Sequence, residues 1–273
     1  MDLQAYFDRI GFHGEARTDA ATLSAIHRRH LLGIPFENLD ILLGRRVDLD
    51  EERIFDKLVR RRRGGWCYEM NGLFAWALET IGFDVTRLAG GVDRAQRGDD
   101  AVGNHLTLLV EAGGEWLADV GFGDGLFEPV PLAEGLIVQR GFESSLRRIG
   151  DGWWRFNNHQ HGGAPHYDFR VEPASTLQLE RQCEFLQTSE LSGFTQTLTA
   201  QRQFDDRVEI LRNSVRSTVF PDRVQRFVLG SVDEFLAELV DVFGIDDPDS
   251  ASLWPNAEAN GRSFVVENPE LFQ

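Results

Sequence analysis

The 273-residue sequence predicts an α+β protein with an N-terminal helical bundle, a central antiparallel β-barrel or sheet, and a C-terminal α/β lid. Apolar residues recur at helical spacing up to about residue 84. Short strands separated by turn residues follow to about residue 190, a pattern typical of antiparallel sheets and barrels. Beyond that point, strands mix with one capped amphipathic helix. We therefore expect three domains, at residues 1–84, 85–190 and 191–273.

Four helices are expected in the first domain. They are expected at 3–10, from Thr18 to about 31, from near Asp48 to about 59, and from the region of Cys67 to Gly82. Gly64 and Gly65 provide a tight turn before the last helix, so Cys67 falls at or near its N-terminus. Free backbone N–H groups and the helix dipole favour an anion there. A thiol in this position loses its proton more easily, and the thiolate is the nucleophile.

The second domain is expected to contain a hairpin that carries His105 and Asp119. With a three-residue loop at 111–113, Val110 pairs with Gly114, and His105 lies opposite Asp119 on one sheet face. Directly opposed residues have Cβ atoms about 5 Å apart. A four-residue loop would instead place the two side chains on opposite faces. The expected strands are 85–88, 103–110, 115–121, 153–156 and 166–171.

The third domain is expected to contain a helix that begins at Ser231. Glu234 stands three residues later, in the register of a capping box. Apolar residues from Phe235 to Phe243 line one face, and Gly244 ends the helix.

Cys67, His105 and Asp119 are the residue types of a nucleophile, a base and a group that orients the base. Taken alone, a cysteine is more often a small buried hydrophobe, which is the role we expect for Cys183, and a lone histidine is more often structural. Asp119 lies within an otherwise apolar run, however, and a buried carboxylate is costly unless it is paired. A partner for Asp119 is therefore expected.

Four motifs in order resemble the arylamine N-acetyltransferase family. They are Ile-Pro-Phe-Glu-Asn-Leu (34–39), Arg-Gly-Gly-Trp-Cys-Tyr-Glu-Met-Asn (63–71), Asn-His-Leu-Thr-Leu-Leu-Val (104–110) and Asp-Val-Gly-Phe-Gly (119–123). The resemblance implies a cysteine-protease-like catalytic core with Cys67, His105 and Asp119 as the catalytic triad. It also implies acetyl-CoA as the acetyl-donor cosubstrate, with no permanently bound cofactor, and an arylamine or hydrazine as the acceptor. The family further suggests an ion pair of Arg63, for which Glu37 is the candidate partner.

The same resemblance suggests which residues surround the substrates. Gly123 belongs to a glycine-rich loop, 121–125, where missing side chains let a ligand approach the backbone. The expected substrate-binding residues are Phe36, Asn104, Phe122, Gly123, Phe127 and Phe204, with the phenylalanines as apolar walls for an aryl ring. Any one phenylalanine is more often plain core. The loop lacks the spacing and the following helix of a dinucleotide site.

Composition narrows the class of protein further. A formal net charge of −16 argues against nucleic-acid binding, which needs a basic face. The same charge is unfavourable for binding anionic coenzyme A, so local arginines or backbone amides must offset it. No stretch approaches a membrane span, residues 1–4 lack a secretory pattern, and two cysteines exclude a disulfide framework. We expect a cytoplasmic monomer or homodimer.

The sequence also raises a metal site and other classes of protein as alternatives. His159, His161 and His166 could in principle bind a metal, but only Asp168 stands near them and no cysteine does, so no metal site is expected.

A Cys-His-Asp hydrolase or transglutaminase-like enzyme would share the triad chemistry and differ in its acceptor. An amide synthase of a biosynthetic pathway, or a non-catalytic binding module on the same scaffold, would also look similar. The favoured interpretation is acetyl transfer by a ping-pong mechanism through an acetyl-Cys67 intermediate.

Overall fold

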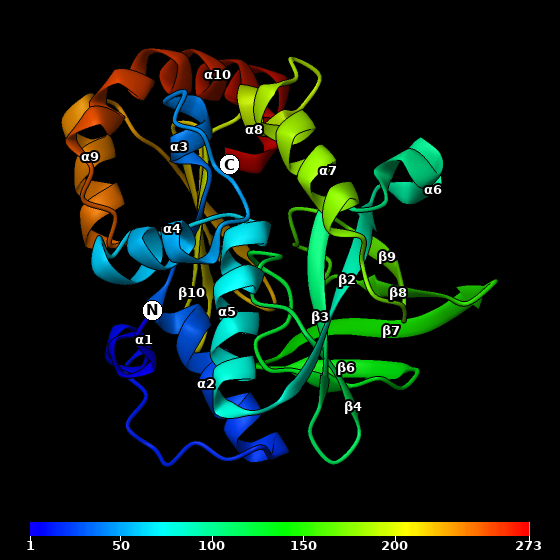
Figure 1. The fold of residues 1–273 in the computed structure, drawn as a ribbon. Helices are drawn as coiled ribbons and strands as arrows, with labels where there is room; N and C mark the ends of the chain where they lie inside the picture. The colour runs from blue at the N-terminus through cyan, green and yellow to red at the C-terminus, as the bar shows by residue number, and fades with distance from the viewer. Residues whose placement is uncertain (273) are drawn as a thin grey trace.

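The computed structural model describes residues 1–272 and confirms the α+β class. Two antiparallel sheets and a helical segment pack together, and α5 (Cys67–Ile81) stands beside β3 (His105–Glu111) at their junction (Figure 1). The remaining helices and helical turns are α1 (Leu3–Ile10), α2 (Ala20–Gly33), α3 (Leu39–Leu42), α4 (Glu51–Phe55), η1 (Asp56–Arg60), α6 (Arg94–Arg97), η2 (Gly98–Ala101), α7 (Thr176–Thr188), α8 (Gly193–Gln196), α9 (Val232–Asp241), η3 (Pro248–Leu253), α10 (Trp254–Glu267) and η4 (Pro269–Phe272).

The larger sheet has eight strands in the order β5-β4-β3-β2-β9-β8-β7-β6 and curls toward a barrel (Figure 1). Its other strands are β2 (Asp84–Val92), β4 (Glu115–Ala118), β5 (Val130–Pro131), β6 (Gly135–Gln139), β7 (Phe142–Gly150), β8 (Trp153–Asn157) and β9 (His166–Arg170). The smaller sheet has the order β1-β10-β11-β12-β13. Its strands are β1 (Phe36–Glu37), β10 (Thr199–Gln203), β11 (Val208–Arg212), β12 (Val215–Val219) and β13 (Val224–Val228).

The expected helices are present, with their starts set by side-chain caps. The carboxylate of Asp19, rather than Thr18, caps α2 by accepting from the Thr22 N–H, and Asp50, rather than Asp48, caps α4 by accepting from the Arg53 N–H. The third helix then widens into a π-helical turn, η1, which apolar periodicity did not indicate. Ser231 caps α9 as predicted.

The predicted hairpin forms with its register shifted by two residues. Val110 pairs with Trp116 rather than with Gly114, and the ladder ends where Leu108 pairs with Ala118. Because side chains alternate, a shift by two keeps His105 and Asp119 on the same face, whereas a shift by one would separate them. The β6–β7 hairpin and α7 were not expected from the sequence.

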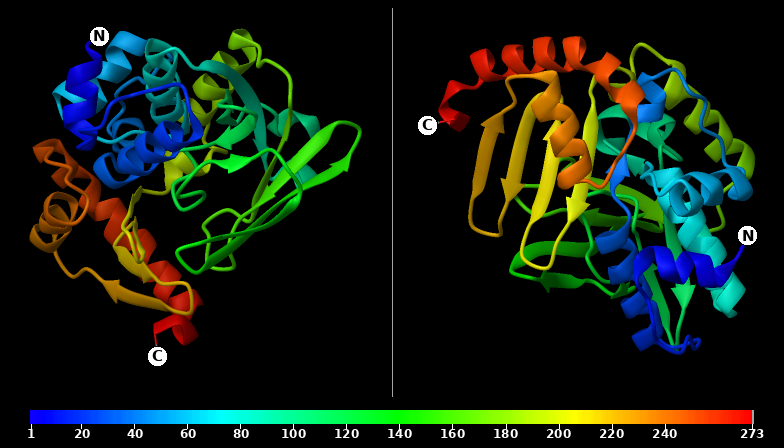
Figure 2. Two further views of the ribbon diagram at one scale, coloured as in Figure 1. Left: turned by 90° about the horizontal axis from the view of Figure 1, so that it is seen from below. Right: turned by 90° about the vertical axis from the view of Figure 1, so that its left-hand side faces the viewer.

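The smaller sheet joins parts of the chain that are far apart in sequence. β1 comes from the N-terminal part and pairs with β10, so the smaller sheet is not built from the C-terminal part alone. α9 covers one face through a cluster that includes Leu211, Phe235 and Leu239, and α10 runs across one end of the strands (Figure 2, right). The expected boundaries at 84 and 190 stay a prediction.

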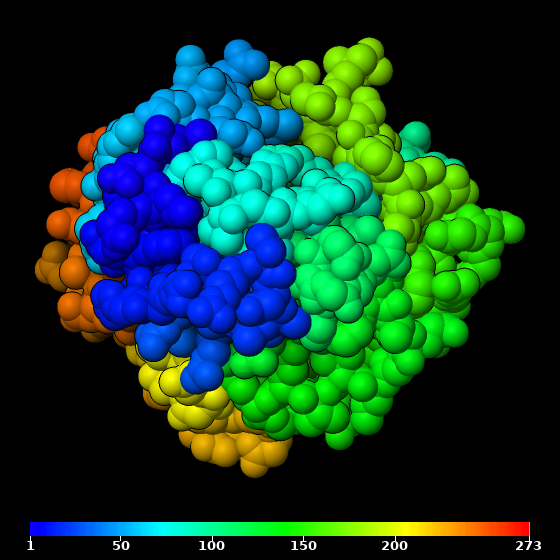
Figure 3. Space-filling view, turned by 60° about the horizontal axis from the view of Figure 1, so that its bottom comes forward, coloured from blue at the N-terminus to red at the C-terminus, as the bar shows by residue number. Residues whose placement is uncertain are grey.

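The main hydrophobic core lies between the N-terminal helices and β3, and includes Tyr6, Phe74, Leu78 and Leu108. In the space-filling view, the residues near the N-terminus (dark blue) border the part of the chain that includes α5 (cyan), the eight-stranded sheet (green) and the smaller sheet (yellow) (Figure 3). This core fixes α5 against the sheet that carries His105. No helix within residues 1–272 is both long and apolar enough to cross a lipid bilayer.

Candidate active site

A glycine turn places Cys67 at the first position of α5, as predicted. The Gly65 N–H donates to the Pro35 carbonyl (3.2 Å), and the Glu37 N–H donates to the Gly65 carbonyl (2.9 Å). A Cβ atom on Gly64 would lie 2.3 Å from the Pro35 oxygen, so the backbones approach too closely for any side chain there. The turn thus ties the start of α5 to β1.

A buried charge cluster holds the N-terminus of α5. The Glu69 carboxylate accepts from the Trp66 N–H (3.2 Å) and from the Lys57 ammonium (3.0 Å), and Lys57 also contacts Asp40 (2.9 Å). Burial raises the pKa of Glu69 to about 7, even though Lys57 opposes the rise. Arg63 pairs with Glu37 at 2.8 Å, which confirms the expected ion pair, and it also contacts Asp247 from the C-terminal part.

His105 and Asp119 form a buried pair. The His105 Nε2 lies 2.7 Å from Asp119 Oδ2, and each residue is 2% exposed. His105 is therefore the partner that was expected for the buried carboxylate of Asp119. Because Nε2 bonds to the carboxylate, Nδ1 is the ring nitrogen left for another group.

Asp119 is held by several hydrogen bonds besides that of His105. Its Oδ1 accepts from Asn71 Nδ2 (2.9 Å) and from the Gly121 N–H (2.9 Å). Burial would raise the pKa of Asp119, but the charge and hydrogen bond of His105, with these other donors, hold it below its ordinary value. Asp119 is therefore a carboxylate that orients His105.

Cys67 lies in the same cavity as His105. Cys67 and His105 both line a cavity of about 430 Å³, and no hydrogen bond joins them in the structure. Burial raises the pKa of the Cys67 thiol, whereas the backbone N–H groups of Leu106 and Tyr68 lower it. Burial thus opposes the effect of the helix N-terminus on this thiol. Moving the proton to His105 would keep the charge in the cavity as an ion pair.

Three of the expected substrate-binding residues line the cavity: Phe36, Asn104 and Phe122. The Phe122 ring packs edge-on against His105, with centroids 5.2 Å apart. The Asn104 side chain accepts from the Val92 N–H (2.8 Å) and donates to the Val92 carbonyl (3.0 Å). Asn104 therefore ties β2 to the strand that carries His105.

The other three lie outside the cavity lining. Gly123 has a φ of +77°, and a Cβ atom there would lie 1.6 Å from Gln201 Oε1. Phe127 is buried under the Arg140 guanidinium, 3.7 Å from its ring centroid. Phe204 lies under Arg207 beside the β10–β11 turn. A role for these three in substrate binding stays a prediction.

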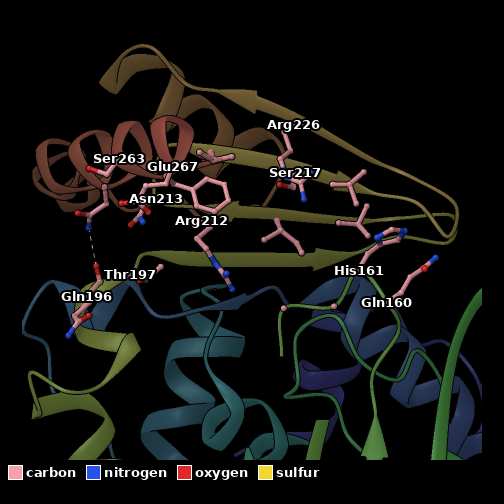
Figure 4. A pocket seen from close by; sticks show the side chains of 18 residues that line it. Gln160, His161, Gln196, Thr197, Arg212, Asn213, Ser217, Arg226, Ser263 and Glu267 are labelled. Carbon is pink, nitrogen blue, oxygen red and sulfur yellow. Dashed lines mark hydrogen bonds between the residues drawn. The ribbon is translucent and has the colours of Figure 1, made fainter. Parts of the chain in front are cut away.

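A second groove continues from the cavity along the face of the smaller sheet. It has a volume of about 870 Å³, and Gly163, Thr197 and Arg212 line both spaces. Arg212 on β11 and Arg226 on β13 enter the groove from the same face of the sheet, with Ser217 on the strand between them (Figure 4). Among residues 1–272, neither guanidinium forms a hydrogen bond or an ion pair.

Among the three candidate metal-binding histidines, His159 uses its ring nitrogens in hydrogen bonds within the protein. His159 Nε2 donates to the Asp124 carbonyl (3.0 Å), and its Nδ1 accepts from the His161 N–H (3.3 Å). Both ring nitrogens of His159 are thus used within its own loop and by Asp124. Within residues 1–272, no group of three or more His, Cys, Asp or Glu side chains is arranged to hold a metal ion.

Sequence reasoning missed three residues that support the site: His27, Lys57 and Asn71. His27 and Lys57 reach it from α2 and η1, and each is a buried polar residue among mostly apolar neighbours on its helix. Asn71 belongs to the 63–71 motif, so its position was visible although its role was not.

Comparisons with known proteins agree with this arrangement. A family model described as N-acetyltransferase matches residues 19–249. The chain is 40% identical to an arylamine N-acetyltransferase of Mycolicibacterium smegmatis over 92% of this chain and 94% of the relative. It is 34% identical to human arylamine N-acetyltransferase 1 over 77% and 81% of the two chains.

Solved structures give the same result. The structure of the M. smegmatis arylamine N-acetyl transferase superposes with a TM-score of 0.85 at 37% identity, covering 95% of this chain and 98% of that one. A Mycobacterium marinum arylamine N-acetyltransferase in complex with CoA superposes with a TM-score of 0.83 at 29% identity, covering 96% and 99%.

Proposed function

Because the chain belongs to the arylamine N-acetyltransferase family, we propose that it transfers the acetyl group of acetyl-CoA to arylamines or hydrazines. The observation that carries the mechanism is that His105, bonded to the buried Asp119, lines one cavity with Cys67. Cys67 is the nucleophile, His105 the base and Asp119 the group that orients the base.

The first half-reaction loads the enzyme. As Cys67 Sγ attacks the acetyl carbonyl carbon, the thiol proton passes to His105 Nδ1, the ring nitrogen not bonded to Asp119. The resulting oxyanion needs donors aimed at it, and the backbone N–H groups of Tyr68 and Leu106 are the candidates near the sulfur. The carbon–sulfur bond to coenzyme A then breaks, and His105 returns the proton to the departing thiolate.

The second half-reaction transfers the acetyl group. The amine nitrogen attacks the carbonyl carbon of acetyl-Cys67, and His105 accepts a proton from the amine. The Cys67 thiolate then leaves, His105 passes the proton back to the sulfur, and the enzyme returns to its starting state, as in ping-pong kinetics. Arylamines are weak bases that stay neutral near pH 7, so they suit a cavity walled by Phe36 and Phe122.

The groove beside the cavity suits the anionic part of coenzyme A. The protein carries a formal net charge of −16, so a polyanion needs local cations. Arg212 and Arg226 have no partner among residues 1–272 and line a groove that opens from the cavity. We place the diphosphate and 3′-phosphate of the donor along these two guanidinium groups, which bind phosphate well.

A reducing compartment suits a free thiol nucleophile. Both cysteines are buried and unpaired, so we propose the cytoplasm as the location of the protein.

A labelling experiment tests the proposal. The protein is mixed with radiolabelled acetyl-CoA alone, and a panel of arylamines and hydrazines is then added. We expect stable label on Cys67, its transfer to the amine, and no label on a Cys67→Ala variant. Label on that variant would show another nucleophile. Rapid loss of acetyl-CoA before any amine is added would show a hydrolase instead.

A further inference from the structure

The chain leaves the eight-stranded sheet at the carboxylate that orients His105. The ladder between β3 and β4 ends at Ala118, so the backbone N–H groups of Asp119, Val120 and Gly121 have no strand partner. All three residues are buried, and a buried N–H group without an acceptor is strongly unfavourable. Side chains must therefore supply the acceptors.

Each of the three N–H groups bonds to a different side chain. The Gly121 N–H donates to Asp119 Oδ1 (2.9 Å), and the Val120 N–H donates to Asn71 Oδ1 (3.0 Å). The Asp119 N–H donates to His27 Nε2 (3.2 Å). His27 lies on α2, 92 positions earlier in the chain.

The two bonds of His27 fix its tautomer. Nδ1 lies 3.1 Å from the Phe127 carbonyl, which is only an acceptor, so Nδ1 carries the proton. Nε2 is then the lone-pair nitrogen that accepts from Asp119. The imidazole is neutral and joins both ends of the 119–127 segment, which includes Phe122 in the cavity wall.

We propose that His27 is a positioning residue for the reaction, because it holds the backbone of Asp119 so that the carboxylate meets His105. The proposal rests on the proposed role of the His105–Asp119 pair. His27 lies outside the cavity lining, forms its hydrogen bonds to Phe127 and Asp119, and acts through Asp119. Its ring also packs edge-on against Phe74 of α5, with centroids 5.5 Å apart, so it contacts the nucleophile helix as well.

His30 provides a matched control on the same helix. Both histidines are 0% exposed, and both rings pack against Phe74 with centroids 5.5 Å apart. His30, however, bonds to the Tyr6 hydroxyl (2.9 Å) and makes no hydrogen bond to the 119–127 segment. A loss of core packing should affect the two positions alike, whereas a loss of Asp119 positioning should follow only from His27.

The test compares His27→Leu, His27→Gln and His30→Leu with the parent protein. The readout is the rate of iodoacetamide alkylation of Cys67 against pH, followed by mass spectrometry of its peptide, with kcat and KM measured beside it. In His27→Leu we expect alkylation near pH 6 and kcat to fall about tenfold to hundredfold, with little change in KM for the amine. Glutamine can accept from Asp119 and donate to Phe127, so His27→Gln should recover most of the rate.

Several results would overturn the proposal. One is an unchanged alkylation profile in folded His27→Leu, and another is an equal change in His30→Leu. If His27→Leu does not fold, ¹⁵N-histidine NMR of the parent protein decides, with the His27 signal assigned by its loss in His27→Gln. A neutral Nδ1–H ring down to pH 5 supports the proposal, and a ring that titrates near pH 6.5 contradicts it. Because alkylation needs no acetyl-CoA, failure of acetyl transfer in the parent protein would overturn the proposed function separately.

Discussion

Binding of acetyl-CoA should be most sensitive to substitution of single arginines in the groove. Arg226 enters the groove, whereas Arg223, on the same β12–β13 hairpin, is exposed and pairs with Asp222. Changing either arginine to glutamate alters the net charge of the protein equally. The two variants therefore separate a local contact from the overall field.

We predict that Arg226→Glu raises KM for acetyl-CoA about tenfold or more, because a charge-assisted bond to phosphate is lost and a repulsive carboxylate takes its place. The rate at which preformed acetyl-enzyme reacts with the amine should not change. Steady-state kinetics with each substrate varied in turn provides the measurement. An equal rise in KM for Arg223→Glu would mean that the net charge, not the groove, is responsible.

Buried histidines should make the stability of this protein depend on pH. Burial lowers the pKa of His27 from 6.5 to about 4. As pH falls below about 6.5, the unfolded chain binds a proton at this residue that the folded chain does not bind until about pH 4. Stability is therefore lost as pH falls through this window, by about 2 kcal/mol between pH 7 and 5 from His27 alone.

Urea unfolding at pH 7 and pH 5 tests this prediction. His27→Gln removes the titrating group, so its free energy of unfolding should fall by about 2 kcal/mol less than that of the parent protein. His30, whose pKa is also lowered by burial, acts in the same direction, and Glu69, whose pKa is raised to about 7, acts in the opposite one. The difference in free energy of unfolding between the two proteins at each pH gives the contribution of His27 alone, because His30 and Glu69 are present in both. An identical pH dependence in both would contradict the assigned cause.

At the scale of elements, the start of α5 depends on one buried cation. Lys57 is 4% exposed and faces the carboxylates of Glu69, Asp40 and Glu37. Burial lowers its pKa, but the three carboxylates outweigh this and keep it charged. Removing the ammonium would leave the buried Glu69 without a cationic partner, whereas Glu37 and Asp40 would keep Arg63.

We predict that Lys57→Met lowers the free energy of unfolding by about 3–5 kcal/mol. The control is Arg60→Met in the same turn, since Arg60 is exposed and pairs with Glu52, so its loss should lower stability much less. A second substitution, Glu69→Gln, should restore part of the stability lost in Lys57→Met, because the amide still accepts from the Trp66 N–H. Equal losses in Lys57→Met and Arg60→Met would contradict the importance of the cluster.

The elements also show how far local sequence signals reach. Caps and glycine stops predicted α5 and α9 well, because their causes lie within a few residues of each other. The hairpin register was wrong by two, yet the facing of His105 and Asp119 was right, since it depends only on parity. The contact between Asp119 and His27 joins residues 92 positions apart, and no local pattern in either segment predicts it.

At the scale of the whole molecule, the cavity is assembled from all parts of the chain. Cys67 comes from the helical segment, His105 from the eight-stranded sheet, and Arg212 from the smaller sheet. The molecule that surrounds these residues carries a formal net charge of −16, so its long-range field repels the donor even where local cations attract it. The neutral acceptor is not subject to this repulsion.

The two half-reactions should therefore respond differently to salt. The Debye length falls from about 30 Å at 0.01 M ionic strength to about 10 Å at 0.1 M, which screens the distant carboxylates more than the short contacts to Arg212 and Arg226. We predict that kcat/KM for acetyl-CoA rises several-fold over this range, whereas kcat/KM for a neutral arylamine stays nearly constant. In Arg226→Glu the rise should be steeper, because a local attraction becomes a repulsion. A steady fall of kcat/KM for acetyl-CoA with salt would mean that the groove arginines, rather than the net charge, govern the approach of the donor.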